Sequence, residues 1–403
     1  MKCRICESRK IYELIDFGSM PPANSLKLNS DSNILKEYEL LLQYCPECHN
    51  LQLSECVDNE ELYKDYLYVT PDSKMLQRHY QVLIDFLSDR KYLNNRSSLI
   101  EVGSNSGQFL QQIKKYVDRC IGIDPAECIV KEANEKGINT ICDFFGTNSV
   151  EKILKAFGRA DLIVGRHCMA HNCDLNSLFS AACSLLTDDG VLVIENAYAL
   201  NTIENNEYDQ IYHEHMYYFS IRSLDVALRN NGLRIIDVTR SDIHGGSIIF
   251  IVSKIESNMK ESDSVKKLRR IEELIITKDR LSHFAQNSRF NANEIYNLVA
   301  QIKKDGGKIY CYGATAKGST LLNYSRLTNK HIDVCVDNTP IKQNRVLAGS
   351  NIPIVDEDYA IKNPPDYFLL TAWNYKEEII KKYRDSGNSK TLFIVPVPTI
   401  TIL

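Results

Sequence analysis

Short apolar runs alternate with amphipathic stretches along most of this chain, and this pattern predicts a mixed α/β protein. Between residues 76 and 252, β-rich runs predict buried strands at 98–103, 120–124, 161–164 and 190–195. The stretches between them have the periodicity of helices. Such alternation is typical of a doubly wound parallel sheet with helices on both faces.

The same alternation starts again after Gly306 and Gly307. Predicted strands follow at 308–313, 334–336, 367–370 and 391–395, and a Lys/Glu/Leu-rich stretch at 258–304 predicts helix before them. The first 70 residues carry paired cysteines and few periodic segments. We therefore expect a small module at 1–70, an α/β domain at 71–255, and a helical segment with a second Rossmann-like domain at 256–403.

Composition narrows the possible classes of protein. The chain has 403 residues, 13 cysteines and a formal net charge of −4. No global positive charge would draw it to nucleic acid or an anionic membrane surface, and no apolar run approaches the ~18 residues of a membrane span. An odd number of cysteines in a large chain argues against a secreted disulfide framework. We expect a cytoplasmic protein that binds neither nucleic acid nor membrane.

Two Cys-x-x-Cys pairs occur in the first module, Cys3/Cys6 and Cys45/Cys48. Each pair can direct two thiolates at one ion, and four thiolates form a closed tetrahedral zinc shell without a water site. We predict a structural zinc rather than a catalytic one. Four free cysteines in a small core are the alternative. A nucleic-acid-binding zinc module is disfavoured, because residues 1–65 hold 7 Lys/Arg against 12 Asp/Glu.

A glycine loop follows the first strand of the middle domain. Its G-x-x-x-G spacing suits an amino-acid nucleoside better than a pyrophosphate. The acid that ends the second strand could accept both ribose hydroxyls, and an Asp-Phe pair after the third could hold an adenine. Alternatively, the glycines serve only packing. The candidate ligands are Glu101, Gly103, Ser104, Asn105, Gly107, Asp124, Asp143 and Phe144.

Titratable groups concentrate in the segment from Tyr208 to Ser220, which contains Tyr212 and His213-Glu214-His215. In an extended segment the two histidines share a face and Glu214 points away. A histidine base tuned by the neighbouring carboxylate fits this pattern better than a metal site, because the HExxH spacing is absent. Surface polar residues beside an aromatic core are the alternative. His171 and His244 are further histidines at predicted strand ends.

A second glycine loop, Gly313 to Gly318, lies between a strand and a helix of the last domain. Backbone N–H groups at the helix start, together with Lys317, Ser319 and Thr320, could bind a diphosphate. The alternatives are a loop that only packs and, because Asp337 ends the next strand, an NAD site.

These motifs together resemble those of the sugar-nucleotide C-methyltransferases that act on 4-keto-deoxysugars. The resemblance covers essentially the whole chain. Its marks are the four cysteines, the segment 16–24, Tyr66-x-Tyr68, the loop 101–107, the segment 208–215, the segment 244–247, the loop 312–318, the segment 337–343 and Ala372-Trp373-Asn374. The resemblance implies S-adenosylmethionine as methyl donor, a structural zinc and a sugar-nucleotide substrate.

The family's site residues map onto this chain motif by motif. The resemblance implies His215 as the base that removes the C3 proton of the sugar, with Glu214 orienting its ring or raising its basicity. It also implies catalytic roles for Tyr212, Tyr68 and His171. His167 stands where the family has an asparagine on the cofactor side, and His244 and Asn374 are expected on the substrate side.

Two other functions remain open from the sequence. An O- or N-methyltransferase on a related sugar nucleotide would share the donor domain but form no enolate. A zinc- and nucleotide-binding regulator would have no catalytic residues. The presence of Tyr68, Glu214 and His215 together favours the C-methyltransferase. We expect a monomer or a weak homo-oligomer.

Overall fold

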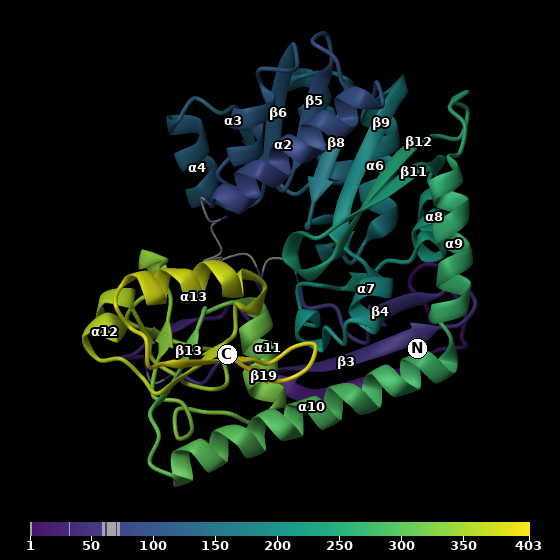
Figure 1. Cartoon of the computed structure of the whole chain (residues 1–403). Helices are drawn as coiled ribbons and strands as arrows, with labels where there is room; N and C mark the ends of the chain where they lie inside the picture. Colours follow the sequence, from purple (N-terminus) through teal and green to yellow (C-terminus); the bar gives the residue numbers. More distant parts are fainter. Residues whose placement is uncertain (1, 32, 59–60, 63–69, 71–72) are drawn as a thin grey trace.

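The structure is a computed structural model that describes residues 2–31, 33–58, 61–62, 70 and 73–403. Three main sheets and their covering helices form the molecule (Figure 1). The predicted fold class, a small N-terminal module followed by two α/β domains, is confirmed.

The middle domain contains a seven-stranded sheet in the order β11-β12-β9-β8-β5-β6-β7. The five strands from β9 to β7 are parallel, and β12 and β11 are added in antiparallel fashion. The strand order reverses between β5 and β8, which opens a crevice at the carboxyl ends of the strands. The strands are β5 Ser98–Val102, β6 Arg119–Asp124, β7 Thr140–Cys142, β8 Ala160–Arg166, β9 Leu186–Ala197, β11 Leu233–Ser241 and β12 Ser247–Lys254.

Helices cover both faces of this sheet, and side-chain caps fix where several of them begin. The hydroxyl of Ser73 accepts the N–H of Leu76 at the start of α2, and the Asp174 carboxylate accepts the N–H of Ser177 at the start of α6. None of the helices in the described ranges is long and apolar enough to cross a membrane. The helices are α2 Lys74–Asp89, α3 Gln108–Ile113, α4 Glu127–Glu135, α5 Val150–Ala156, α6 Leu175–Leu185, α7 Ala199–Glu204 and α8 Ile221–Arg229.

The N-terminal module is an antiparallel sheet that includes a strand from the middle domain. Its own strands are β1 Tyr12–Met20, β3 Tyr38–Cys45 and β4 Asn50–Leu53, and β10 Tyr217–Tyr218 pairs with β4. A second link joins β2 Lys27–Leu28 to β15 Arg345–Val346 of the last domain. The module is therefore hydrogen-bonded to both of the other units.

The C-terminal domain is a second doubly wound sheet, in the order β16-β14-β13-β17-β18-β19, in which only β19 is antiparallel. The strands β14 and β16 lie on one side of β13, and β17 and β18 lie on the other. The strand order therefore reverses at β13, and a crevice forms at its carboxyl end. The strands are β13 Ile309–Tyr312, β14 Cys335–Val336, β16 Ile354–Val355, β17 Tyr367–Leu370, β18 Leu392–Val395 and β19 Thr401–Ile402, and the helices are α11 Ala316–Tyr324, α12 Glu357–Lys362 and α13 Lys376–Asp385.

Two helices connect the α/β domains where the sequence predicts one helical stretch. They are α9 Asp263–Ile275 and α10 Lys278–Lys304. The helix breaks because Thr277 is extended and its hydroxyl accepts the N–H of Arg280, which starts α10. Helix α10 runs beneath the N-terminal sheet to the C-terminal domain (Figure 1), and one apolar core joins residues of all three units along it.

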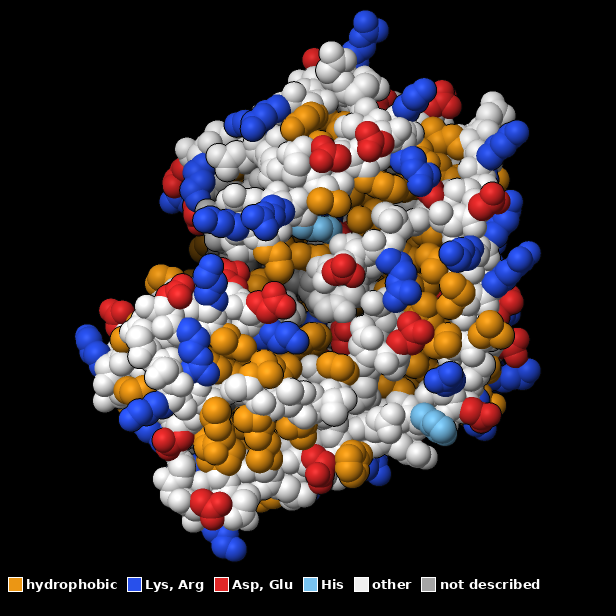
Figure 2. All heavy atoms as spheres, viewed as in Figure 1, with side chains coloured by type: hydrophobic (Ala, Val, Ile, Leu, Met, Phe, Trp, Pro, Cys, Tyr) orange, Lys and Arg blue, Asp and Glu red, His pale blue; other side chains and the backbone are white. Residues whose placement is uncertain are grey.

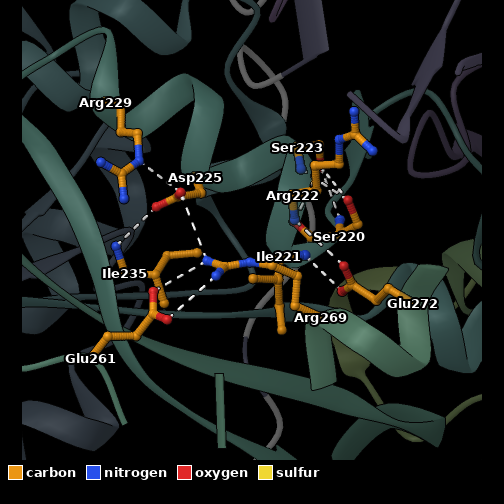
Figure 3. A network of polar contacts seen from close by, with 10 residues as sticks. All are labelled: Ser220, Ile221, Arg222, Ser223, Asp225, Arg229, Ile235, Glu261, Arg269 and Glu272. Carbon is orange, nitrogen blue, oxygen red and sulfur yellow. Dashed lines mark hydrogen bonds and ion pairs between the residues drawn. The ribbon is translucent and has the colours of Figure 1, made fainter. Parts of the chain in front are cut away.

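A polar network joins the start of α8 to α9 (Figure 3). The buried Glu272 carboxylate accepts the Ile221 N–H at 2.7 Å and the Tyr198 hydroxyl at 2.8 Å. An acid at a helix N-terminus compensates the unpaired N–H groups there. From the same turn, Arg222 donates to the Glu47 carbonyl in the second cysteine pair. The start of α8 is thus tied to the predicted zinc site.

Candidate active site

A cavity of about 540 Å³ lies between the middle and C-terminal domains. Figure 2 shows a hollow between these two lobes on the face viewed in Figure 1. The carboxyl ends of β5, β6 and β8 line one half, and those of β13, β14 and β17 line the other. Asn24 from the N-terminal module also lines it. All three units therefore contribute to one site of a size typical for small ligands.

The middle-domain half contains most of the predicted donor ligands. Those that line the cavity are Gly103, Ser104, Asn105, Asp124, Asp143, Phe144 and His167. Gly103 has φ +65° and packs against Cys168, where a Cβ would come within 2.8 Å of that side chain. Only glycine adopts this conformation at such close approach without strain. The loop is held tightly against the end of β8.

Asp124 ends β6 with its carboxylate in the cavity. One oxygen accepts the N–H of Asn105 at 2.9 Å and the other accepts the N–H of Ala126 at 3.0 Å. Burial raises the pKa of Asp124, against the lowering effect of these two N–H donors. Each carboxylate oxygen has a second lone pair for a ligand hydroxyl.

The residues present fit S-adenosylmethionine. Asp124 offers acceptors where a ribose is recognised in such sheets. Gly103 and Ser104 bring the backbone of the glycine loop to the same wall, while the Ser104 hydroxyl packs against Gly122 of β6. Asp143 and Phe144 provide an acceptor and an apolar ring after β7.

Two predicted donor ligands lie outside the cavity lining. Glu101 is buried beneath the loop, where its carboxylate pairs with Arg166 at 2.8 Å. Burial raises the pKa of Glu101 to about 7. Gly107 has φ +75° at the start of α3 and packs on Ile138. Glu101 is thus placed to hold Arg166, and Gly107 to turn the chain, rather than to contact a ligand directly.

His215 and Tyr212 form a hydrogen-bonded pair on the cavity wall. The Tyr212 hydroxyl lies 2.6 Å from His215 Nε2, and the two ring centroids are 3.9 Å apart. On the other side of the imidazole, Nδ1 lies 3.0 Å from the Gln210 carbonyl. A carbonyl only accepts, so Nδ1 carries the proton and Nε2 of the neutral ring is the basic atom.

Glu214 contacts Asn24 of the N-terminal module, and the Gln210 carbonyl occupies the position at the His215 ring that was expected for this carboxylate. The N–H of His215 donates to the Tyr212 carbonyl, so the segment makes a tight turn here instead of staying extended. The turn directs Glu214 to Asn24, whose amide donates to the carboxylate at 2.8 Å. His213 lies 3.3 Å from the Tyr38 carbonyl and does not line the cavity. The Gln210 carbonyl orients the His215 ring instead.

His171 lies beside this pair, on the short 3-10 turn Met169–His171 after β8. Its ring centroid is 5.1 Å from that of His215, and it lines the cavity. Burial lowers the pKa of His171 to about 4. The ring is therefore neutral near pH 7 and keeps one N–H that can donate to a substrate oxygen. Tyr68 and the side chain of His244, two further predicted residues, lie outside what the structure describes.

The C-terminal half contains three lysines on the cavity wall, Lys317, Lys342 and Lys382. The Lys317 ammonium lies 4.9 Å from the Trp373 ring centroid. Asn374 also lines the cavity. The sequence singled out Lys317 and Asn374 but missed Lys342 and Lys382, which lie far from the glycine loop in the sequence.

Ser319 and Thr320 do not line the cavity, although the sequence suggested them as diphosphate ligands. Both are 1% exposed on the inner face of α11. The Thr320 hydroxyl donates to the Ile211 carbonyl at 2.8 Å. Thr320 therefore holds the residue before Tyr212 and supports the segment that carries Tyr212 and His215.

Asp337 repeats the arrangement of Asp124 in the other half of the cavity. One of its oxygens accepts the N–H of Ala314 at 2.8 Å, and the other accepts the N–H of Thr339 at 2.9 Å. Asp124 ends β6 and Asp337 directly follows β14, so both lie at the carboxyl end of a strand and line the cavity. The surroundings of the two aspartates differ in one respect: the Lys342 ammonium lies 3.5 Å from the Asp337 carboxylate. In the sequence, Asp337 was recognisable as an aspartate at the end of a predicted strand.

The matched aspartates allow a controlled test of donor binding. We expect Asp124→Asn to weaken S-adenosylmethionine binding at least about tenfold, because hydrogen bonds to a charged group contribute roughly 1.5–3 kcal/mol. Asp337→Asn removes the same kind of group from the other half and should leave donor affinity unchanged. Titration calorimetry of both variants checks this expectation. Equal donor affinity in wild type and Asp124→Asn would contradict it.

The four predicted zinc ligands converge in the N-terminal module. All four sulfur atoms lie within 4.8 Å of one another, with Cys3 and Cys48 at 3.6 Å and Cys6 and Cys45 at 3.5 Å. Sulfur atoms around tetrahedral zinc, at bonds of roughly 2.3 Å, are about 3.8 Å apart. The donor set fits zinc. Four thiolates complete the shell, so the zinc is structural.

Three family models match successive parts of the chain. One described as "Putative zinc binding domain" matches residues 3–63, one described as "Methyltransferase domain" matches 74–238, and one described as "C-methyltransferase C-terminal domain" matches 242–398. The C-methyltransferase NovU of Streptomyces niveus is 33% identical over 400 residues, which cover 98% of this chain and 95% of that protein.

Solved structures resemble this chain more distantly. The N-methyltransferase NodS of Bradyrhizobium japonicum is 15% identical, with a TM-score of 0.35, and the match covers 46% of this chain and 99% of that one. The magnesium protoporphyrin IX methyltransferase of Synechocystis, with bound S-adenosylmethionine, is 14% identical, with a TM-score of 0.33, and the match covers 44% and 79%.

Proposed function

Since this chain belongs to the C-methyltransferase family, we propose that its S-adenosylmethionine-dependent C-methylation acts on a nucleotide-linked 4-keto-deoxysugar, at C3, through an enolate. The observation that carries the proposal is the His215–Tyr212 pair in a cavity with two different halves. One half fits the donor. The other provides lysines and a strand-end aspartate, the groups that suit a nucleoside diphosphate.

The substrate class is supported by the charges of the C-terminal half. Lys317, Lys342 and Lys382 can neutralise a diphosphate. Asp337 can accept a hydroxyl of the pentose, as strand-end acids do in doubly wound sheets. Both halves line one cavity, so ligands held by the two halves would face each other, which the transfer of a methyl group between them requires.

The carbon nucleophile is supported by the geometry around His215. A ketone at C4 acidifies the hydrogens on C3. His215 Nε2 takes the C3 proton, either directly or through the Tyr212 hydroxyl, which gives its own proton to Nε2 as it receives the sugar's. The C–H bond breaks, an N–H bond forms, and the electron pair moves onto the C4 oxygen. Such a base typically contributes roughly 10²–10⁴-fold to the rate.

Two further groups support the enolate. Neutral His171 can donate an N–H to the developing oxyanion. The Gln210 carbonyl keeps His215 in the tautomer whose Nε2 is basic. Bound S-adenosylmethionine would supply the electrophilic methyl group of its sulfonium to C3 and would leave as S-adenosylhomocysteine when the S–CH₃ bond breaks.

Loss of deuterium from C3 tests the carbon nucleophile directly. With a 4-keto sugar nucleotide deuterated at C3, we expect the enzyme to exchange the label with water in the presence of S-adenosylhomocysteine, because deprotonation does not need the methyl group. NMR follows the exchange, and mass spectrometry of the product locates the methyl group. A methylated product that retains all the C3 deuterium would contradict the enolate and indicate O- or N-methylation instead.

A further inference from the structure

We propose that Arg166 binds the α-carboxylate of S-adenosylmethionine, as a specificity-determining residue of the donor site. Arg166 is the last residue of β8 and lines the cavity. The strand β8 neighbours β5 on the side opposite β6. Asp124 at the end of β6 and Arg166 at the end of β8 therefore lie on the two sides of the glycine loop. Adjacent strands are about 4.8 Å apart, so the two strand ends are separated by roughly 10 Å.

This separation matches the shape of the donor. Its ribose and its amino-acid carboxylate lie on opposite sides of the sulfonium that joins them. With the ribose at Asp124, the methionyl part crosses the carboxyl end of β5 toward β8. The carboxylate then reaches the end of β8, where Arg166 lies.

The surroundings of Arg166 hold its guanidinium in one position. Glu101 accepts from Nη2 at 2.8 Å, and the guanidinium carbon lies 4.5 Å from the ring centroids of both Tyr80 and Phe109. The side chain is 14% exposed, so it is enclosed yet reaches the cavity wall. A guanidinium fixed in this way is preorganised for a planar carboxylate.

Arg166 also has binding capacity that the described residues do not use. Glu101 takes one of the five N–H donors of the guanidinium, and the side chain keeps its 14% exposure at the cavity wall. The structure provides the cation, holds it against Glu101, and leaves a donor for another group.

The distribution of cations over the cavity wall supports the assignment. Among the described lining residues, Arg166 is the only Lys or Arg that the middle domain contributes, and the other cations are the three lysines of the C-terminal domain. The donor carries a single carboxylate. The donor half therefore contains one matching cation, placed away from the lysines that suit a diphosphate.

A purely structural role for Arg166 makes a different prediction. In that role it neutralises Glu101 and packs α2 and α3 onto the sheet, without contacting the ligand. Removing Arg166 would then weaken every donor analogue by the same factor. If Arg166 binds the carboxylate, its removal weakens only analogues that have one.

The test compares S-adenosylhomocysteine with its decarboxylated analogue by titration calorimetry, without turnover. For wild type we expect the analogue to bind at least about tenfold more weakly, since it lacks the charged partner. For Arg166→Met we expect the two ligands to bind with similar affinity. Arg166→Lys, which keeps the charge but not the planar fork, should show an intermediate ratio.

Asp124→Asn is the matched control, because it should weaken both ligands equally and preserve their ratio. Equal affinity of the two ligands for wild type would overturn the proposal, whatever the fold of the variants. A wild-type ratio retained in Arg166→Met would overturn it as well and assign Arg166 to the structural role.

Discussion

Replacing His215 with asparagine is expected to lower turnover by roughly 10²–10⁴-fold while both ligands still bind. The reason is the position of Nε2, which is 2.6 Å from the Tyr212 hydroxyl on the cavity wall and is made basic by the Gln210 carbonyl at Nδ1. Asparagine keeps polarity and approximate size but cannot take a proton. The measurement combines steady-state turnover with hydrogen exchange at C3 in D₂O, in the presence of S-adenosylhomocysteine.

His213→Asn is the control for this experiment. His213 belongs to the same turn and is as deeply buried, but it contacts the Tyr38 carbonyl and does not line the cavity. A loss of activity from general damage to the turn should appear in both variants. The proposed base is incorrect if His215→Asn exchanges the C3 hydrogen at the wild-type rate. Tyr212→Phe then shows whether exchange passes through the hydroxyl, because it leaves Nε2 in place.

Loss of zinc is expected to unfold the N-terminal module and to reduce turnover strongly. Removing one thiolate with Cys45→Ala opens the shell, and structural zinc contributes roughly 10–16 kcal/mol in isolated zinc-finger peptides. That figure is comparable to or larger than the whole stability of a typical domain, about 5–15 kcal/mol. Zinc content by elemental analysis and thermal unfolding of wild type and variant measure the effect.

The effect on turnover follows from how the module is joined to the catalytic segment. β4 pairs with β10, two residues after His215, and Asn24 donates to Glu214. Donor binding provides the internal control, since its predicted ligands lie in the middle domain and S-adenosylhomocysteine affinity should change little. A zinc-free protein with wild-type unfolding temperature and wild-type turnover would contradict the expectation.

Features that depend on local chain geometry were predictable from the sequence. Cys-x-x-Cys turns bring two thiolates together wherever they occur, and the four sulfur atoms do converge. Strands that end in a glycine loop or an aspartate direct those residues to the carboxyl edge of a parallel sheet, and Gly103, Asp124 and Lys317 all line the cavity there. The same alternation predicted both doubly wound sheets, but it did not locate β11 and β12 of the first or β16 and β19 of the second.

Side-chain directions within short segments were less predictable. The turn at Tyr212–His215 sends three consecutive side chains to three different places: the Tyr38 carbonyl, Asn24 and the cavity. Each direction depends on the backbone angles of one residue, which the sequence pattern does not specify. Thr320 is buried because its face of α11 packs against Ile211, and this packing could not be seen in the sequence of the helix.

The sequence alone determined the zinc ligands, the two doubly wound domains and the strand ends that line the cavity, because these features rest on spacing and periodicity within short stretches of chain. Only the tertiary structure decided which of these strand ends face each other across one cavity. It also decided that Arg166 pairs with Glu101, and that Asn24 reaches Glu214 from 190 positions away. Such contacts arise when sheets and helices pack, and the packing of whole elements is not encoded in any one segment.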